Sequence, residues 1–177
     1  MNMGIIAASR LRASQIEPSI NLFGSLSGNN KWLGGVLAPN GKIYGIPRNS
    51  TQILEIDPTN NTTSLFGSLP GGENKWAGGV LAPNGKIYAI PTLSTQILEI
   101  DPTNNTTSLF GSFSENAKWR GGVLAPNGKI YAIPRESNQV LEIFGVDSPN
   151  VIGSDANIPA SLANLASSNY NEYYNKL

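Results

Sequence analysis

An eleven-residue segment occurs three times in this chain without a single change, and it constrains the fold more than any other feature. The segment Gly-Gly-Val-Leu-Ala-Pro-Asn-Gly-Lys-Ile-Tyr spans residues 34–44, 78–88 and 121–131. The tryptophans that precede it are 44 and 43 residues apart. A period of about 40–50 residues is typical of four-stranded propeller blades, whereas most helical repeats are shorter. The sequence therefore predicts three repeated units of one kind.

Each unit divides into four short apolar segments separated by turn residues. In the first unit we expect strands over residues 34–38, 42–46, 52–56 and 62–69. The Asn40-Gly41 pair predicts a type I′ hairpin between the first two, because both residue types tolerate positive φ. No window in this region shows a convincing helical period, and the third segment is rich in β-branched residues. The predicted fold class is all-β, with three four-stranded propeller blades in residues 18–146.

The third unit lacks an outer strand, and a matching segment stands before the first unit. Residues 20–26 match the outer strands at 64–69 and 108–113, while the third unit stops matching after residues 139–143. We interpret this as a velcro-type permutation, in which the N-terminal strand completes a last blade and removes an open sheet edge. Three blades are too few for a ring, since propellers have about 4–8. The sequence thus predicts a homo-oligomer, with a dimer of six blades favoured over a trimer of nine.

Two segments outside the repeats, residues 1–17 and residues 147–177, are predicted to attach the propeller to a larger assembly; the alternative is that they are frayed termini. The repeat resembles kelch/NHL-like propeller repeats in two motifs, Asn-Gly-Lys-Ile-Tyr-Gly-Ile-Pro and the later Leu-Glu-Ile-Asp-Pro-Thr-Asn-Asn-Thr. Separately, residues 4–10 and 169–177 are similar to the openings and endings of bacteriophage tail and minor structural proteins. This resemblance implies a virion component without catalytic residues, partnered by other virion proteins. A secreted or cell-surface location is the alternative.

Composition narrows the chemistry that the chain can perform. It carries 12 basic and 12 acidic residues, no His and no Cys. Balanced charge argues against nucleic-acid binding, and the lack of a long apolar run argues against membrane insertion. Without imidazole or thiolate, the commonest proton-transfer group and the usual zinc ligands are missing. We therefore predict that the chain is not an enzyme and needs no cofactor or metal.

One face of the predicted propeller gathers aromatic rings and polar side chains. A Lys-Trp pair precedes each inner strand, and in propellers this loop shares a face with the loop between the second and third strands. The ligand-binding candidates on this face are Lys31, Trp32, Arg48, Asn49, Lys75, Trp76, Lys118, Trp119 and Arg135. Such a face suits sugar rings, so a lectin-like propeller that contacts a host-surface glycan is the alternative function. The competing interpretation is that each Trp packs between neighbouring blades.

Two repeated acidic patterns have simpler explanations than catalysis or metal binding. Residues 57–61 and 101–105 offer oxygen ligands, but their spacing does not match an EF-hand loop. We expect their side chains to bond their own turns. Glu55, Glu99 and Glu142 recur in the third strand of each unit. A glycosidase needs two carboxylates in different environments, so we predict that these glutamates are solvent-facing partners of a neighbouring strand.

Overall fold

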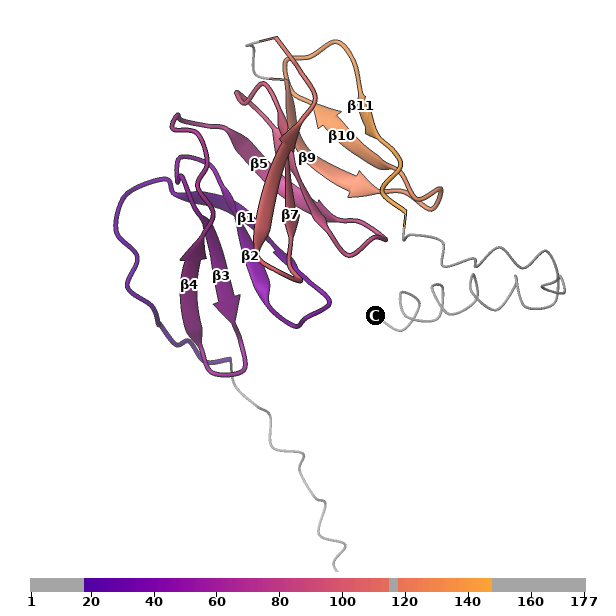
Figure 1. Ribbon diagram of the computed structural model, residues 1–177. Coiled ribbons are helices and arrows are strands. Elements are labelled where there is room, and N and C mark those ends of the chain that lie inside the picture. The colour runs from indigo at the N-terminus through magenta and orange to yellow at the C-terminus, as the bar shows by residue number, and fades with distance from the viewer. Residues whose placement is uncertain (1–17, 115–117, 148–177) are drawn as a thin grey trace, which may run out of the picture.

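Three antiparallel sheets, one for each repeated unit, form the described part of the protein (Figure 1). The computed structural model describes residues 18–114 and 118–147. Its strands are β1 (Trp32–Leu37), β2 (Ile43–Pro47), β3 (Ile53–Asp57), β4 (Thr62–Phe66), β5 (Trp76–Leu81), β6 (Ile87–Pro91), β7 (Ile97–Asp101), β8 (Thr106–Phe110), β9 (Trp119–Leu124), β10 (Ile130–Pro134) and β11 (Leu141–Ile143). The described residues contain no helix, and hence none that could span a membrane. The predicted all-β propeller fold is confirmed.

We number the sheets as blades 1, 2 and 3. Blade 1 has the order β1-β2-β3-β4, blade 2 has the order β5-β6-β7-β8, and blade 3 has β9, β10 and β11 within the described residues. Each blade is a meander, because every strand pairs with the next one along the chain. The predicted attachment segments 1–17 and 147–177 lie outside the described residues, except for Asp147.

The inner strands β1, β5 and β9 lie side by side where the blades converge (Figure 1). A Cβ placed on Gly34 would lie 3.3 Å from the Cα of Gly78, and one on Gly78 would lie 3.3 Å from the Cα of Gly121. Gly34 and Gly78 also have positive φ, of 83° and 73°. The repeated Gly-Gly pair is therefore explained by close backbone approach between blades.

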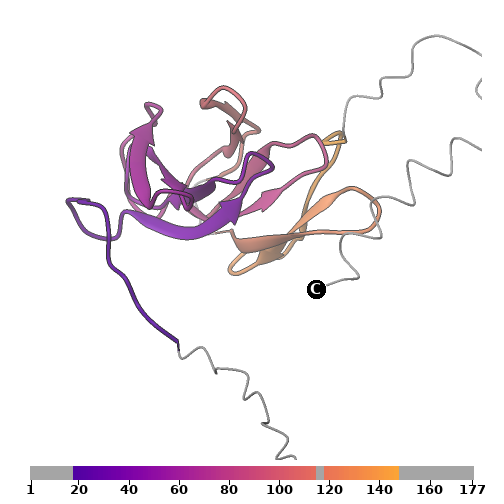
Figure 2. The same ribbon diagram turned by 90° about the horizontal axis from the view of Figure 1, so that it is seen from below.

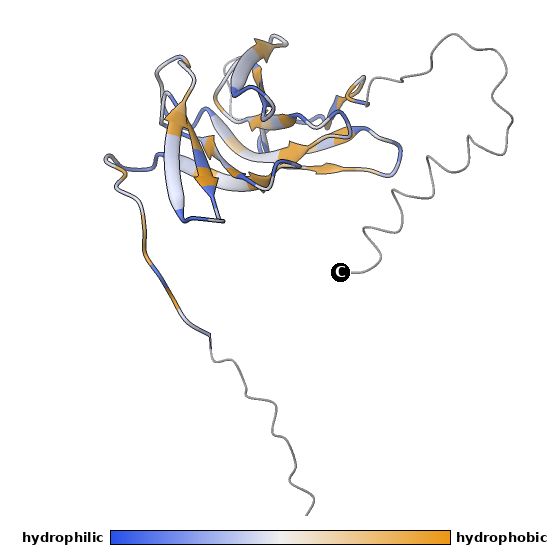
Figure 3. Cartoon of the chain, turned by 60° about the horizontal axis from the view of Figure 1, so that its bottom comes forward, coloured by the Kyte–Doolittle hydropathy of each residue, from blue (hydrophilic) through white to orange (hydrophobic). Residues whose placement is uncertain are grey.

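The hydrophobic core lies between adjoining blades, and apolar residues recur along the strands in Figure 3. Ile46 in β2 and Ile90 in β6 are completely buried. Ile46 packs on the next blade at Gly79, where an added Cβ would lie 2.6 Å from the Ile46 Cδ1 atom. Ile90 packs in the same way on Gly122, at 2.9 Å. A large residue on one blade thus fits against a glycine on the next.

The turn between β1 and β2 differs from the predicted type I′ hairpin. Gly41 has a φ of 79°, but Asn40 does not have the positive φ that this turn type requires. Instead, the Gly41 N–H donates to the Ala38 carbonyl at 3.0 Å. The Asn40 side chain accepts a hydrogen bond from the Lys42 N–H at 3.1 Å and donates to the hydroxyl of Tyr44 at 2.9 Å. These side-chain bonds favour a different turn, so the predicted turn type is wrong.

Residues 18–31 form no strand within the chain. Ile20 and Leu22 are 96% and 92% exposed. The segment leaves blade 1 and extends away from the sheets (Figure 2), and part of it is apolar (Figure 3). Within one chain the predicted pairing of residues 20–26 with blade 3 is therefore not formed. Pairing across chains stays a prediction.

Candidate functional site

The two loops that carry the nine candidate residues lie on one face, as the sequence indicated. In blade 1, the Lys31 carbonyl accepts hydrogen bonds from the N–H groups of Arg48, Asn49 and Ser50 at 2.9, 3.2 and 3.1 Å. The Lys118 carbonyl accepts the three equivalent bonds in blade 3, whereas the Lys75 carbonyl accepts two of them in blade 2, and the Leu93 N–H donates to the Asn74 carbonyl instead. The repeated Lys backbone therefore fixes the loop between the second and third strands against the entry to the inner strand.

The three tryptophans bond within their own blades. The indole N–H of Trp76 donates to the Gln96 carbonyl at 2.9 Å, and Trp32 and Trp119 make the same bond to Gln52 and Gln139. Trp76 is 1% exposed and Trp119 is 7% exposed. These placements favour the packing interpretation over sugar stacking for Trp76 and Trp119. Ligand contact at the tryptophans stays a prediction.

The lysines of the Lys-Trp pairs help to join the blades. Lys75 is 5% exposed, and its Nζ atom donates to the Ser50 carbonyl of blade 1 at 2.8 Å. The same ammonium group lies 5.6 Å from the ring centroid of Trp76. Burial lowers the pKa of Lys75 below its ordinary value. Lys118 makes the corresponding contact with the Ser94 carbonyl of blade 2 at 3.4 Å. The side chains of Lys75 and Lys118 therefore have a structural role, because each bonds to the preceding blade.

A pocket of about 250 Å³ opens on this face between the blades. Arg48 from blade 1 and Arg120 and Arg135 from blade 3 line it. The remaining lining residues come from blades 1 and 2 and are Leu33, Asn74, Trp76, Ala77, Thr92 and Leu93. Of the nine predicted positions, the structure brings together Arg48, Trp76 and Arg135 in this pocket. We call it the arginine pocket.

The arginine pocket holds more positive than negative charge. The Arg48 Nε–H donates to the Asn74 side-chain oxygen at 2.6 Å, which orients its guanidinium group. Arg135 lies 3.4 Å from a carboxylate oxygen of Glu136, in a pair that is about half exposed. Among the described residues, Arg120 has no ion-pair partner. Of the three arginines that line the pocket, only Arg135 has an ion-pair partner among the described residues.

Arg120 is a pocket residue that was not among the residues predicted from the sequence. It directly follows Trp119, at a position where the other two units have Leu33 and Ala77. Comparison of the repeats emphasises shared residues, and Arg120 is a difference between them. A search for charged substitutions beside the repeated Trp would have found it.

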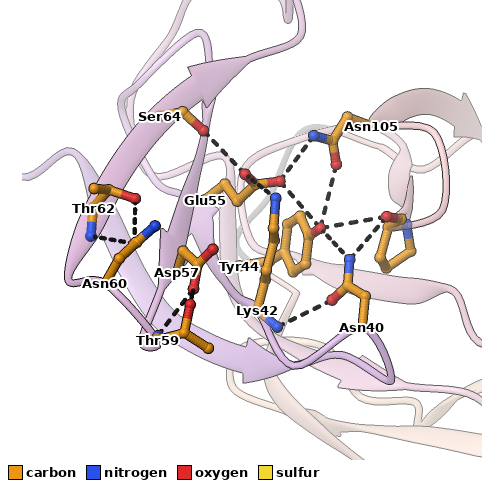
Figure 4. Close-up of polar contacts among 11 residues, drawn as sticks. Asn40, Lys42, Tyr44, Glu55, Asp57, Thr59, Asn60, Thr62, Ser64 and Asn105 are labelled. Carbon is orange, nitrogen blue, oxygen red and sulfur yellow. Dashed lines mark hydrogen bonds and ion pairs between the residues drawn. The ribbon is translucent and has the colours of Figure 1, made fainter.

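A polar network joins blades 1 and 2 at the opposite end of the strands (Figure 4). Glu55 accepts hydrogen bonds from the Lys42 ammonium at 2.8 Å and from the Asn105 side chain of blade 2 at 2.8 Å. The Tyr44 hydroxyl donates to Asn105 at 3.2 Å. Burial alone would raise the pKa of Glu55, but hydrogen bonds from Lys42, Asn105 and Ser64 bring it below its ordinary value. At 7% exposure Glu55 is buried, so the prediction of a solvent-facing glutamate is wrong there.

The glutamate of this network is progressively more exposed from blade 1 to blade 3. The side chains of Glu55, Glu99 and Glu142 are 9%, 21% and 38% exposed, although each pairs with a lysine at 2.7–2.8 Å. Asn105 covers Glu55 from the following blade. In the described part of the chain, no blade follows blade 3. The exposure of Glu142 therefore reflects a missing neighbour.

The repeated Asp and Asn turns bond internally, as expected. Asp57 accepts a hydrogen bond from the Thr59 N–H at 2.9 Å, and Asn60 accepts one from the Thr62 N–H at 3.1 Å. The second unit repeats both bonds. Within residues 18–114 and 118–147, no group of three acidic, His or Cys side chains is placed to hold a metal ion. The turn geometry accounts for these residue types.

Comparison with known proteins identifies the fold. No protein-family model and no curated protein sequence matches this chain. Among solved structures, the chain resembles a streptogramin B lyase, with a TM-score of 0.54 and 12% identity over 64% of this chain and 37% of that one. It also resembles virginiamycin B lyase from Staphylococcus aureus, with a TM-score of 0.54 and 16% identity over 65% and 38%. Hydrazine synthase from Kuenenia stuttgartiensis gives a TM-score of 0.52 and 12% identity over 71% and 36%.

These similarities correct one prediction and support another. The prediction that the chain is not an enzyme, made from its lack of His and Cys, is wrong, because the propeller structures that it resembles include two lyases. At 12% and 16% identity the similarity shows the fold alone. The chain spans less than two fifths of the length of each lyase. The three described sheets have the β-propeller fold.

Proposed function

We propose that the arginine pocket binds the anionic group of a small ligand, either a carboxylate or a phosphate. The observation that carries this proposal is the convergence of Arg48, Arg120 and Arg135 from two blades on one pocket of about 250 Å³. A guanidinium group presents a planar fork of N–H donors that matches both anions. An exposed Arg120 without an ion-pair partner among the described residues is available for such a contact.

The rest of the pocket suits a ligand with both polar and apolar parts. Leu33 and Leu93 provide apolar walls, while Asn74 and Thr92 provide polar groups. Ligand sites commonly combine apolar walls with a few polar groups that fix the ligand's orientation. Because Asn74 already orients Arg48 at 2.6 Å, part of the site is organised before a ligand arrives. An acidic sugar or a small organic acid has the required chemistry.

Isothermal titration calorimetry at low salt tests the proposal with four probes: citrate, inorganic phosphate, glucuronate and glucose. We expect an anionic probe to bind, with affinity that decreases as salt is added. Arg120→Gln removes a charged donor from an exposed side chain, so binding should weaken roughly tenfold or more. Lys86→Gln is the control, since it removes one positive charge at the opposite end of blade 2.

The four probes separate the possible outcomes. Binding of citrate or phosphate alone would identify an organic acid or a phosphate as the ligand class. Glucuronate binding without glucose binding would identify an acidic sugar. Equal binding of glucose and glucuronate would favour the lectin-like alternative and contradict the anion proposal. Loss of binding in Lys86→Gln but not in Arg120→Gln would also contradict it.

A bacteriophage virion role and the kelch/NHL-like assignment stay predictions. The virion role depends on residues 4–10 and 169–177, which lie outside the described residues. The propeller fold is shared with proteins of other kinds, so it does not favour a virion. Mass spectrometry of purified virus particles tests the role directly: the protein is present in the particles if the prediction is right and absent if it is wrong.

A further inference from the structure

We propose that two copies of this chain close into a six-bladed ring, in which residues 20–23 of each copy form the fourth strand of blade 3 in the other. Blade 3 has three strands where blades 1 and 2 have four. The same chain carries an unpaired segment with the sequence of an outer strand.

The register of the complete blades predicts how the exchanged strand would pair. In blade 1, Leu54 lies opposite Leu65 and Ile53 lies opposite Phe66. The repeat aligns Leu22 and Phe23 with these outer-strand residues, and Leu141 and Val140 with their partners. Leu22 is 92% exposed, Phe23 is 43% exposed and Val140 is 59% exposed. Pairing Leu22 with Leu141 would bring these apolar side chains together.

The two partners of one more aromatic contact lie apart, one in blade 3 and the other in the N-terminal segment. Tyr44 meets Phe66 edge-on at a centroid distance of 6.0 Å in blade 1, and Tyr88 meets Phe110 at 6.0 Å in blade 2. Tyr131 is the equivalent tyrosine of blade 3 and has no such phenylalanine among the described residues. Phe23 of a second copy would supply it.

Gly24 shows that the segment already leaves blade 1 in the direction that exchange requires. Its φ is 83°, close to the 79° of Gly67, which ends the outer strand of blade 1. A Cβ on Gly24 would lie 3.1 Å from the Thr63 side chain, and one on Gly67 would lie 3.5 Å from the Thr107 side chain of the next blade. Gly24 is therefore seated against blade 1 as the end of a preceding blade's outer strand would be.

The apolar faces of the two end blades complement each other. Ile46 and Ile90 are completely buried against glycines of the following blade, whereas Ile133, their equivalent in blade 3, is 52% exposed. Val123 beside it is 58% exposed. Blade 1 presents the matching glycine, Gly35, which is exposed. Ile133 of one copy would pack on Gly35 of the other, as Ile46 packs on Gly79.

The polar network between blades also indicates a contact between blade 3 of one copy and blade 1 of the other. Asn105 of blade 2 reaches Glu55 of blade 1 from a left-handed backbone conformation with a φ of 56°. Asn61 occupies the same place in blade 1 and has a φ of 57°, but it is exposed. Glu142 is the equivalent of Glu55 in blade 3, and its side chain is exposed. Asn61 of one copy would therefore bond to Glu142 of the other.

A second copy is the occupant that fits, because every open group on blade 3 corresponds to an open group on blade 1 of the same sequence. The contact is head-to-tail, so it generates a ring when the rotation closes. Two copies give six blades, within the usual range of about 4–8, and three copies would exceed it. The arginine pocket lies within one copy, so failure of this proposal would leave the anion proposal intact.

A designed disulfide tests the strand exchange, because the chain has no cysteine of its own. Leu22→Cys with Leu141→Cys should form a covalent dimer of twice the 18.8 kDa chain mass on a non-reducing gel. Leu54→Cys with Leu65→Cys is the matched control, since the same register pair lies within one chain and should run as a monomer. Native mass spectrometry of the unmodified protein should give the dimer mass.

Several results would overturn the proposal. A native monomer or trimer would contradict the two-copy ring, and a native dimer without the disulfide between Cys variants would contradict the exchanged strand. A disulfide within a single chain at these positions would contradict it as well. As a second test, Phe23→Asp should convert the dimer to a monomer with unchanged tryptophan fluorescence. Leu93→Asp, at a 41% exposed side chain on the pocket face, should stay dimeric.

Discussion

The close approach of the inner strands makes a quantitative prediction for Gly78→Ala. Gly78 has a φ of 73°, and the new Cβ would lie 3.3 Å from the Cα of Gly121. The left-handed conformation costs an L-residue about 1–2 kcal/mol. Overpacking against a backbone atom, which cannot rotate away, adds about 1–3 kcal/mol. The free energy of unfolding should therefore fall by about 2–5 kcal/mol.

Gly85→Ala is the matched control for this prediction. Gly85 has a φ of 79°, and nothing lies within 4 Å of its added Cβ. It should lose only the conformational part, about 1–2 kcal/mol. In urea unfolding followed by tryptophan fluorescence, a difference of about 2 kcal/mol would separate the two midpoints by about 1 M. Equal midpoints would show that adjoining blades tolerate a methyl group between them, and would refute our explanation of the Gly-Gly pair.

Three further predictions concern the polar network and the core. The pKa of Glu55 is lower in the folded protein than its ordinary value of 4.5, so its contribution is present above that pH and lost as the pH falls through the folded-state pKa. Glu55→Gln should accordingly make urea stability decline less steeply below about pH 5. Ile90→Ala should lower the free energy of unfolding by about 2–5 kcal/mol, while Leu93→Ala, at a 41% exposed side chain, should cost much less in the same measurement. Thr92→Val should cost about 1 kcal/mol in thermal unfolding, because it removes a buried hydrogen bond of 3.1 Å to the Trp119 carbonyl, and an unchanged melting temperature would contradict this.

The repeat was sufficient to predict the blades and most of their strands. Residues 34–38 were expected to form an inner strand, and β1 runs over Trp32–Leu37. The absence of a fourth strand in blade 3 was visible as the point where the third unit stops matching. These features are local, because each blade pairs strands that are consecutive in the chain.

Contacts between blades could not be predicted from one unit. Glu55 was expected to face solvent, but Asn105 lies 50 residues later and covers it. The orientation of the Trp76 ring could not be predicted either, because a Trp repeated in every unit is consistent both with packing and with a binding surface. The role of Arg120 in the pocket could not be predicted, because the repeat does not show which strand positions face the pocket.

Blade 3 also has a kinetic consequence. Blades 1 and 2 take all four strands from consecutive residues, so each can be completed by local, first-order folding. The three-residue strand β11 ends the described sheet without such a neighbour. If a second copy supplies its fourth strand, as we propose, completion of this blade is a second-order step. Dilution should then slow the last step of folding while leaving the earlier steps unchanged.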